Sequence, residues 1–269
     1  MTNAWFQDKV AWITGAGSGI GRALAIELAR RGAHVAVSGR REERLAEVAD
    51  EIARESGESG ARVLAVPCDV TDDGAVAGCV ERVVGELGGL DIAVANAGMS
   101  VSGRFESLSA DEWKRQFDVN VLGAVSTMRH ALPHLRETGG RLGLVGSVAA
   151  FMPFPKSSAY CASKFALRAV GLTLAQELHG TGVSVTLLHP GYVESEISQV
   201  DNQGVFDPER KDRRPNKLMW SSERAAQVMA RALYKRRREY VFTGHGKVGA
   251  WFGKHMPGLV HFAVTRRSG

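Results

Sequence analysis

A tyrosine and a lysine stand four positions apart, at Tyr160 and Lys164, in the run Tyr-Cys-Ala-Ser-Lys. Residues with this separation share one face of a helix, so the phenol and the ammonium would lie near each other. A nearby ammonium favours the phenolate and lowers the pKa of the phenol from its usual value of about 10. The pair is therefore a candidate for general acid and base catalysis, although an exposed helical pair would give the same pattern.

A glycine-rich segment with the sequence Thr-Gly-Ala-Gly-Ser-Gly-Ile-Gly runs from residue 14 to residue 21. It follows a short apolar run at 9–14 and precedes a helical pattern over 20–31, which is a strand, loop and helix arrangement. Glycine in such a loop permits a tight turn and lets a pyrophosphate approach the backbone and the helix N-terminus. The segment predicts dinucleotide binding, and a plain glycine turn is the alternative.

The end of the second predicted strand reads Ser38-Gly39-Arg40-Arg41. A site specific for NAD usually has an Asp or Glu there, which binds the 2'-hydroxyl of the ribose. Two arginines and no carboxylate favour a 2'-phosphate instead, because a guanidinium offers a planar pair of donors to phosphate oxygens. We therefore predict that NADP(H) is preferred over NAD(H). The alternative is that both arginines are exposed charges at the start of the next helix.

Short apolar strands alternate with helices along most of the chain. Strands are expected at 34–38, 63–67, 91–95, 142–146, 183–189 and 240–243, and helices at 42–55, 72–86, 113–135, around Tyr160 and at 222–235. This order predicts an α/β fold with a doubly wound, mostly parallel sheet and helices on both faces, which is a Rossmann-like, three-layer α/β/α arrangement. We expect residues 1–269 to form a single domain, with 198–269 as a substrate lid and a variable C-terminal extension.

The composition indicates an ordinary globular protein, with 44% hydrophobic and 23% charged residues among 269. Its cysteines, Cys68, Cys79 and Cys161, have no metal-ligand spacing, so we expect buried thiols in a reducing compartment and no bound metal. Neither an apolar signal core at the N-terminus nor a run of 18 apolar residues is present. The prediction is a soluble cytoplasmic protein.

The basic residues are concentrated toward the C-terminus. Residues 1–204 carry 19 basic and 24 acidic side chains, whereas residues 205–269 carry 15 and 5. The segment 249–267 also places Trp251, Phe252, Met256, Leu259, Val260 and Phe262 among basic residues, which suggests peripheral contact with a membrane surface. Pro257-Gly258 breaks that helix, so a tail packed over the substrate pocket or a neighbouring subunit is the alternative. Nucleic-acid binding is not expected.

These motifs together resemble the short-chain dehydrogenase/reductase family, over about residues 8–197. The elements that carry the resemblance occur in order: the glycine segment 14–21, Asp69, Asn96-Ala97-Gly98, Asn120, Ser147, Tyr160 with Lys164, and Pro190-Gly191. The family often has Asn where Ala95 stands, Ser where Gly146 stands and Thr where Ser195 stands. The resemblance implies an NAD(P)-dependent oxidoreductase that is a homodimer or homotetramer, joined through the helices that contain Trp113 and Tyr160.

The resemblance also implies roles for individual residues. Tyr160 would exchange a proton with the substrate oxygen, Ser147 would hydrogen-bond that oxygen, Lys164 would lower the pKa of the tyrosine and hold the nicotinamide ribose, and Asn120 would anchor a water. Taken alone, Ser147 could be a cap, Asn120 a kink residue and Asn96 a turn former. The cofactor site expected from the motifs and the resemblance comprises Thr14, Gly15, Gly17, Ser18, Gly19, Ile20, Gly21, Gly39, Arg40, Arg41, Asp69, Val70, Asn96, Ala97, Gly98, Tyr160, Lys164, Pro190, Gly191, Val193 and Ser195.

The residues around the predicted site are mostly apolar, which favours a carbonyl or secondary alcohol on a hydrophobic small molecule. The candidates for the substrate pocket are Met99, Val101, Phe151, Met152, Pro153, Phe154, Tyr192 and Val193. Cys161 is interpreted as a packed, inert thiol rather than a redox sensor, and His189 as a structural or pocket-lining residue. The function predicted from the sequence is hydride transfer between nicotinamide and a carbonyl or alcohol carbon. The alternatives are a cofactor-sensing regulator and an epimerase or dehydratase on the same fold.

Overall fold

The computed structural model describes residues 4–55, 60–212 and 214–266. A seven-stranded sheet forms its centre, in the order β3-β2-β1-β4-β5-β6-β7, and the paired strands are all parallel. The strands are β1 (Val10–Thr14), β2 (His34–Gly39), β3 (Val63–Pro67), β4 (Ile92–Ala95), β5 (Arg141–Val145), β6 (Ser184–His189) and β7 (Glu239–Val241). The predicted fold class is confirmed. Residues 1–3 of the predicted domain and Arg267 of the predicted basic segment lie outside the described residues.

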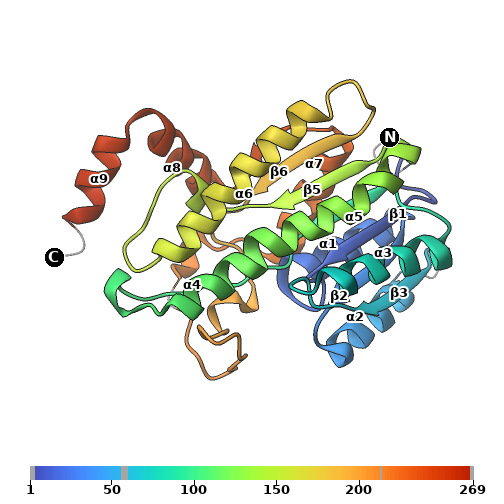
Figure 1. The fold of residues 1–269 in the computed structure, drawn as a ribbon, viewed down its shortest axis with the longest axis horizontal. Helices are drawn as coiled ribbons and strands as arrows, with labels where there is room; N and C mark the ends of the chain where they lie inside the picture. Colours follow the sequence, from blue (N-terminus) through green and yellow to red (C-terminus); the bar gives the residue numbers. More distant parts are fainter. Residues whose placement is uncertain (1–3, 56–59, 213, 267–269) are drawn as a thin grey trace.

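Helices cover both faces of the sheet (Figure 1). One face is covered by α1 (Gly19–Arg30), α2 (Glu42–Glu55) and α7 (Ser222–Tyr234), and the other by α3 (Asp73–Leu87), α5 (Gly123–Thr138) and α6 (Ser158–Glu177). The short helix α4 (Ala110–Phe117) precedes α5. The chain therefore winds outward in both directions from the neighbouring strands β1 and β4, which places the switch point of the topology between them.

Each central strand is buried on both sides because successive side chains point to opposite faces. On β1, Ala11 and Ile13 join the core beneath α1 and α7, whereas Val10 and Trp12 join the core beneath α3 and α5. The indole of Trp12 donates a hydrogen bond of 2.8 Å to the Ser38 hydroxyl, so its one polar atom is satisfied although the side chain is fully buried. This packing fixes the carboxyl ends of the strands, where the predicted site residues lie.

The single helix expected over residues 113–135 is wrong. The structure divides this stretch into α4, a π-helical turn at Asp118–Leu122 and α5. The buried side chain of Asn120 in this turn exchanges hydrogen bonds with the backbone of Met99, at 2.9 and 3.0 Å. A π-turn inserts an extra residue into a helix and re-aims its side chains, and such turns are frequent at functional sites.

The chain continues beyond the sheet as two helices, α8 (Gly244–His255) and α9 (Pro257–Thr265). The break between them falls at Pro257, as the sequence indicated. Figure 1 shows α9 at one extremity of the molecule, away from the sheet. Across residues 4–55, 60–212 and 214–266, every helix is too short or too polar to traverse a bilayer.

Candidate active site

A cleft of about 870 Å³ opens at the carboxyl ends of the strands. The glycine loop after β1, the Arg40 and Arg41 pair after β2, and the segments after β4, β5 and β6 line it. All predicted cofactor residues except Thr14 lie along its wall, as do Ser147, Tyr160 and Lys164. The fold therefore gathers residues that are more than 140 positions apart in the sequence into one cavity, of a size that suits a small ligand.

The glycine loop lies tightly against the turn that follows β4. Gly15 has a φ of 65°, a conformation that glycine adopts without strain. A Cβ at Gly21 would lie 2.4 Å from both the Asn96 Nδ2 and the Gly15 carbonyl oxygen, so no larger residue fits there. The Asn96 amide donates to the carbonyl oxygens of Thr14 and Gly15, at 2.9 and 3.1 Å. These contacts hold the glycine loop against the turn after β4, so that the loop lines the cleft.

Thr14 does not line the cleft, contrary to its predicted place in the cofactor site. Its side chain is buried, and its hydroxyl accepts hydrogen bonds from the backbone N–H groups of Asn96 and Ala97, at 3.1 and 3.2 Å. The same hydroxyl lies 3.3 Å from the Val94 carbonyl oxygen, to which it donates. Thr14 therefore positions the glycine loop by joining the end of β1 to the turn after β4.

Arg41 lies at one end of the cleft, beside the glycine loop. Its Nη2 forms an ion pair of 2.7 Å with the Glu196 carboxylate and lies 3.4 Å from the Ser18 hydroxyl. The guanidinium also lies over the Phe206 ring, 5.4 Å from its centroid. Glu196 comes from the segment after β6, so this ion pair joins the two sides of the cleft. Glu196 was not predicted from the sequence, because its partner lies 155 positions away.

The segment 199–207 crosses the cleft and is fixed at its other side by α4. Asn202 donates to the Ser102 carbonyl oxygen and the Glu112 carboxylate, at 3.0 and 2.8 Å, and its own carbonyl oxygen accepts from Arg115 at 2.8 Å. Val200, Gln203, Gly204 and Phe206 of this segment line the cleft. The segment 199–207 therefore lies over the part of the cavity between α4 and Arg41.

Tyr160, Ser147 and Lys164 line the same cleft as Arg41. Ser147 follows β5, and its hydroxyl caps the next short turn by accepting from the Ala149 N–H at 3.1 Å. Tyr160 and Lys164 lie on the first turns of α6, and the Lys164 ammonium lies 5.7 Å from the centroid of the Tyr160 ring. Lys164 is buried and donates a hydrogen bond of 3.0 Å to the Val145 carbonyl oxygen. Three of the four predicted catalytic side chains therefore line the cleft together.

Burial acts against the predicted effect of Lys164 on the pKa of Tyr160. Burial raises the pKa of the Tyr160 phenol above its usual value, whereas a hydrogen bond with Ser147 and the charge of Arg214 act in the opposite direction. Burial also lowers the pKa of Lys164 to about 8. The cost of burying the phenolate outweighs the nearby donors, so Tyr160 carries its proton at neutral pH.

The low pKa of Lys164 predicts a stability that depends on pH. Its pKa falls from 10.5 in the unfolded chain to about 8 in the folded protein, so the unfolded state binds more protons between these values. Lys164 therefore destabilises the fold fully below pH 8 and progressively less as the pH rises toward 10.5. This fall in pKa corresponds to about 3.4 kcal/mol, and the lost hydrogen bond to Val145 offsets about 1 kcal/mol of it. Lys164→Met should therefore raise the free energy of unfolding at pH 7 by about 2 kcal/mol. Urea unfolding at pH 7 and pH 9.5 checks this, and a gain that is equal at both pH values would contradict it.

Asn120 lies behind the wall of the cleft rather than on its surface. Besides its bonds to Met99, its amide donates to the Ser163 hydroxyl at 3.2 Å. Gln116 joins the same buried network, donating to the Met99 carbonyl oxygen at 3.0 Å and accepting from the Val101 N–H at 2.6 Å. Sequence reasoning missed Gln116 and Ser163. The only signal in the sequence was their position, since Gln116 stands one turn before Asn120 and Ser163 is adjacent to Lys164. In the structure both side chains are fully buried.

His189 explains why glycine stands at position 146, where the resembling family often has serine. A Cβ at Gly146 would lie 2.4 Å from the His189 Nδ1. His189 is fully buried, its Nδ1 lies 3.2 Å from the Ser147 carbonyl oxygen, and its Nε2 lies 3.4 Å from the Glu239 carboxylate. Burial lowers the pKa of His189, so the ring is neutral. It is a structural residue, as the sequence analysis interpreted it.

We expect Gly146→Ser to destabilise the protein by about 2 kcal/mol, because the added side chain overpacks against the His189 ring. Equilibrium unfolding in urea measures this change. Gly85→Ser on α3 is the matched control, since no atom lies within 4 Å of the Cβ that it would add. The double change Gly146→Ser with His189→Ala should recover part of the loss. Equal stability of the Gly146→Ser and Gly85→Ser variants would contradict the packing argument.

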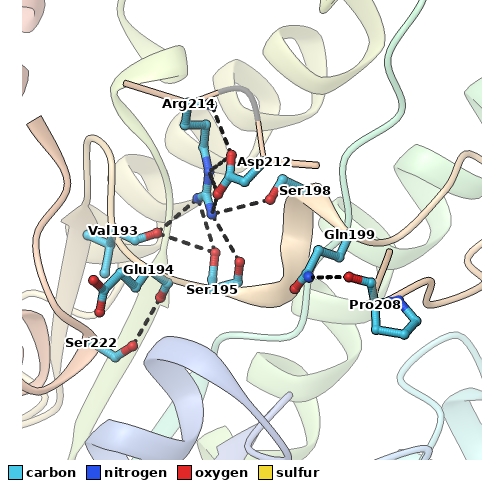
Figure 2. A network of polar contacts seen from close by, with 9 residues as sticks. All are labelled: Val193, Glu194, Ser195, Ser198, Gln199, Pro208, Asp212, Arg214 and Ser222. Carbon is cyan, nitrogen blue, oxygen red and sulfur yellow. Dashed lines mark hydrogen bonds and ion pairs between the residues drawn. The ribbon is translucent and has the colours of Figure 1, made fainter. Parts of the chain in front are cut away.

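Arg214 is a further residue of the cleft that the sequence analysis missed. Figure 2 shows its guanidinium at the centre of a polar network. It donates to the carbonyl oxygens of Val193 and Ser195, at 2.9 and 3.0 Å, and forms an ion pair of 2.7 Å with Asp212. The hydroxyls of Ser195 and Ser198 accept from it at 3.2 and 3.3 Å. Arg214 therefore fixes the segment 193–198 over the cleft, and its charge favours the Tyr160 phenolate.

The candidates for the substrate pocket divide between the cleft and the core beside it. Met99 and Val193 line the cleft, whereas Val101 and Phe151 belong to buried clusters beside it. Tyr192 stacks on His245, with 5.2 Å between ring centroids, and also lies outside the cleft. The apolar side chains that do face the cavity include Met99, Val119, Val193 and Ile197. The apolar character of these residues and their proximity in sequence to the predicted site did not distinguish core residues from residues that line the cleft.

Comparison with known protein families agrees with this geometry. The model of a family described as short chain dehydrogenase matches residues 9–205. An uncharacterised oxidoreductase of Staphylococcus aureus strain MW2 is 37% identical over 196 residues, which are 72% of this chain and 82% of that protein. The 11-beta-hydroxysteroid dehydrogenase 1A of Arabidopsis thaliana is 43% identical over 192 residues, which are 71% of this chain and 54% of that protein.

Solved structures show the same fold. An alcohol dehydrogenase from the archaeon Thermococcus sibiricus, complexed with 5-hydroxy-NADP, has a TM-score of 0.75 and 29% identity, and the match covers 87% of this chain and 96% of that one. A short chain dehydrogenase from Burkholderia cenocepacia in complex with NADP has a TM-score of 0.77 and 30% identity, with 90% and 99% covered. A Burkholderia phymatum relative in complex with NAD has a TM-score of 0.77 and 26% identity, with 88% and 89% covered.

Proposed function

Since the chain belongs to the short-chain dehydrogenase family and is an oxidoreductase of that type, we propose that it uses NADP(H), in preference to NAD(H), to interconvert a carbonyl group and a secondary alcohol on a hydrophobic small molecule. One observation carries the proposal. Tyr160, Ser147 and Lys164 share a single cleft with the glycine loop and with Arg40 and Arg41. A proton donor and a dinucleotide cradle in one cavity suit hydride transfer.

The residues of the cleft fit a dinucleotide. A side chain at Gly21 would collide with Asn96, and one at Gly19 would lie 3.0 Å from Ser195, so these glycines keep a narrow passage open over the N-terminus of α1. Such a helix N-terminus favours the negative charge of a pyrophosphate. Arg40, Arg41 and Ser18 line the same end of the cleft and would bind a 2'-phosphate. The Glu196 carboxylate near Arg41 would have to turn away for that phosphate.

The protein's own groups supply the acid and base chemistry. When bound, NADPH supplies a hydride to the carbonyl carbon. Tyr160, which carries its proton at neutral pH, would donate this proton to the carbonyl oxygen. The Ser147 hydroxyl would donate a hydrogen bond to the same oxygen, where negative charge develops. Lys164 would hold the nicotinamide ribose, and Arg214 would keep the segment 193–198 in place over that end of the cleft.

The apolar wall of the cleft supports a hydrophobic substrate. Met99, Val119, Val193 and Ile197 line the same cavity as Tyr160 and Ser147, and their side chains offer no hydrogen-bonding partners to a sugar. The Arabidopsis relative is a hydroxysteroid dehydrogenase by name, which agrees with this chemistry. We therefore propose ketones and secondary alcohols on lipid-like, steroid-like or aromatic bodies as the substrate class.

Fluorescence titration and a carbonyl panel test this function. Purified protein should bind NADPH more tightly than NADH, and it should oxidise NADPH in the presence of at least one apolar ketone from a panel that also contains free sugars. Tighter binding of NADH would remove the proposed cofactor preference. Turnover of sugars alone would remove the proposed substrate class, and the absence of any dinucleotide binding would contradict the whole proposal.

A further inference from the structure

The helices α8 and α9 form a C-terminal helix pair that is attached to the body through α8. The inner side of α8 carries glycines, and a Cβ at Gly253 would lie 2.3 Å from the Phe151 carbonyl oxygen. At Gly249 a Cβ would lie 3.0 Å from the Met152 sulfur. Lys254 adds an ion pair of 3.1 Å with Glu239. The orientation of α8 is therefore fixed by close packing, which also determines which of its side chains are exposed to solvent.

The outer side of the C-terminal helix pair is apolar and open to solvent. Val248 is 58% exposed, Trp251 52%, Met256 41%, Leu259 47% and Phe262 51%. No residue of α9 is buried, and Figure 1 shows this helix at the edge of the molecule, beyond α8. Large apolar side chains gathered on one exposed surface indicate a binding site. A helix of nine residues is marginal on its own in water, so contact with a further surface would stabilise α9.

The charges on this part of the chain favour an anionic partner. After Glu239 the sequence contains no Asp or Glu, whereas Lys247, Lys254 and Arg266 are cationic. Lys254 is engaged by Glu239, but neither Lys247 nor Arg266 has a carboxylate among the ion pairs of the described residues. Their charged groups instead lie near the rings of Tyr240 and Phe262, at 5.7 and 4.2 Å from the centroids. Cations beside exposed aromatic rings suit a surface that is negative outside and apolar beneath.

We propose that the C-terminal helix pair binds the surface of an anionic lipid bilayer, with Trp251, Leu259 and Phe262 in the headgroup region. The charges around α9 favour this partner over a second copy of the chain, because a second copy would bring the same cations, Lys247 and Arg266, close to each other, whereas anionic headgroups attract them. At about 100° per residue, Leu259 and Phe262 lie about 60° apart and share one face of α9. A helix in a bilayer interface inserts such an apolar face and keeps its cations beside the headgroups. Trp is also a preferred residue at this depth.

Vesicle sedimentation with the full-length protein tests the proposal. The protein should sediment with phosphatidylcholine vesicles that contain phosphatidylserine, and less with phosphatidylcholine alone, because Lys247 and Arg266 attract anionic headgroups. The double change Trp251→Ser and Phe262→Ser should weaken binding to the anionic vesicles about tenfold or more. Phe105→Ser is the matched control, since Phe105 is 70% exposed on a different part of the surface and should leave binding unchanged.

Two further measurements keep the test decisive. NADPH affinity and the unfolding midpoint show that each variant is folded, and brominated lipids should quench a part of the tryptophan fluorescence that Trp251→Phe removes. The proposal is overturned if the unchanged protein does not bind anionic vesicles at low salt, or if the double variant binds them as tightly as the unchanged protein does. A dimer in size-exclusion chromatography that the double variant converts to a monomer would assign this surface to a second copy and would also overturn it.

Discussion

Replacing Tyr160 by phenylalanine should lower the turnover of a carbonyl substrate by about 10²–10⁴-fold while the affinity for NADPH changes little. The substitution removes one oxygen and its proton and keeps the ring that packs at the start of α6. In the proposed reaction this proton neutralises the charge that develops on the substrate oxygen. Ser147 would remain as a hydrogen-bond donor, but a serine hydroxyl is too weak an acid to replace the phenol.

Steady-state rates with a carbonyl from the panel, together with NADPH fluorescence titration, measure the two quantities separately. Tyr192→Phe is the matched control, because Tyr192 stacks on His245 outside the cleft and should keep nearly full activity. A Tyr160→Phe variant with undiminished turnover would exclude the phenol from the chemistry. A variant that loses NADPH binding as well would indicate that Tyr160 acts mainly by holding the cofactor.

Removing both guanidiniums, by Arg40→Ser with Arg41→Ser, should reduce NADPH affinity about 100-fold and leave NADH affinity nearly unchanged. Each charge-assisted hydrogen bond to a phosphate contributes roughly 1.5–3 kcal/mol, and only NADPH carries the 2'-phosphate that these residues would contact. Fluorescence titration of both dinucleotides gives the ratio of affinities. A parallel loss of affinity for NADPH and NADH would mean that the arginines bind a group that both cofactors share.

Glu196→Gln is the opposing control for the arginine variant. The Glu196 carboxylate forms an ion pair with Arg41 in the free protein, so it competes with a phosphate for the same guanidinium. The pair is partly exposed and therefore weak, and its loss should raise NADPH affinity a few-fold without affecting NADH. Lower NADPH affinity in this variant would show that Glu196 assists the cofactor rather than competing with it.

The sequence predicted the fold well because strands and helices differ in their hydrophobic period. The central strands are short and buried on both faces, and successive strands are separated by helices with their own stop signals, such as Gly32 or Gly88. The interruption at Asp118–Leu122 was missed because nothing in the local pattern marks a π-turn. It is stabilised by contacts of Asn120 with Met99 and Ser163, which lie 21 and 43 positions away.

The site was predictable where its residues belong to motifs and not where they act across the cleft. The glycine loop and the tyrosine and lysine pair have fixed spacings in the sequence. In contrast, Arg214 and Glu196 lie in a segment without regular structure, and their roles depend on partners such as Ser195 and Arg41. The predicted influence of Lys164 on the pKa of Tyr160 stays a prediction, and burial acts against it, because spacing gives the distance between two groups but not the cost of burying them.

The helix α7 shows that the boundary of sequence similarity is not the boundary of the folded unit. The family match ends at residue 205, yet Ala226, Met229 and Leu233 of α7 are fully buried against α1 and the sheet. A shortened chain that ended at the family boundary would lose the part of this face's cover that α7 supplies beside α1 and would lack β7. For expression, for domain exchange between relatives and for chimeric enzymes, the smallest useful unit therefore extends through β7.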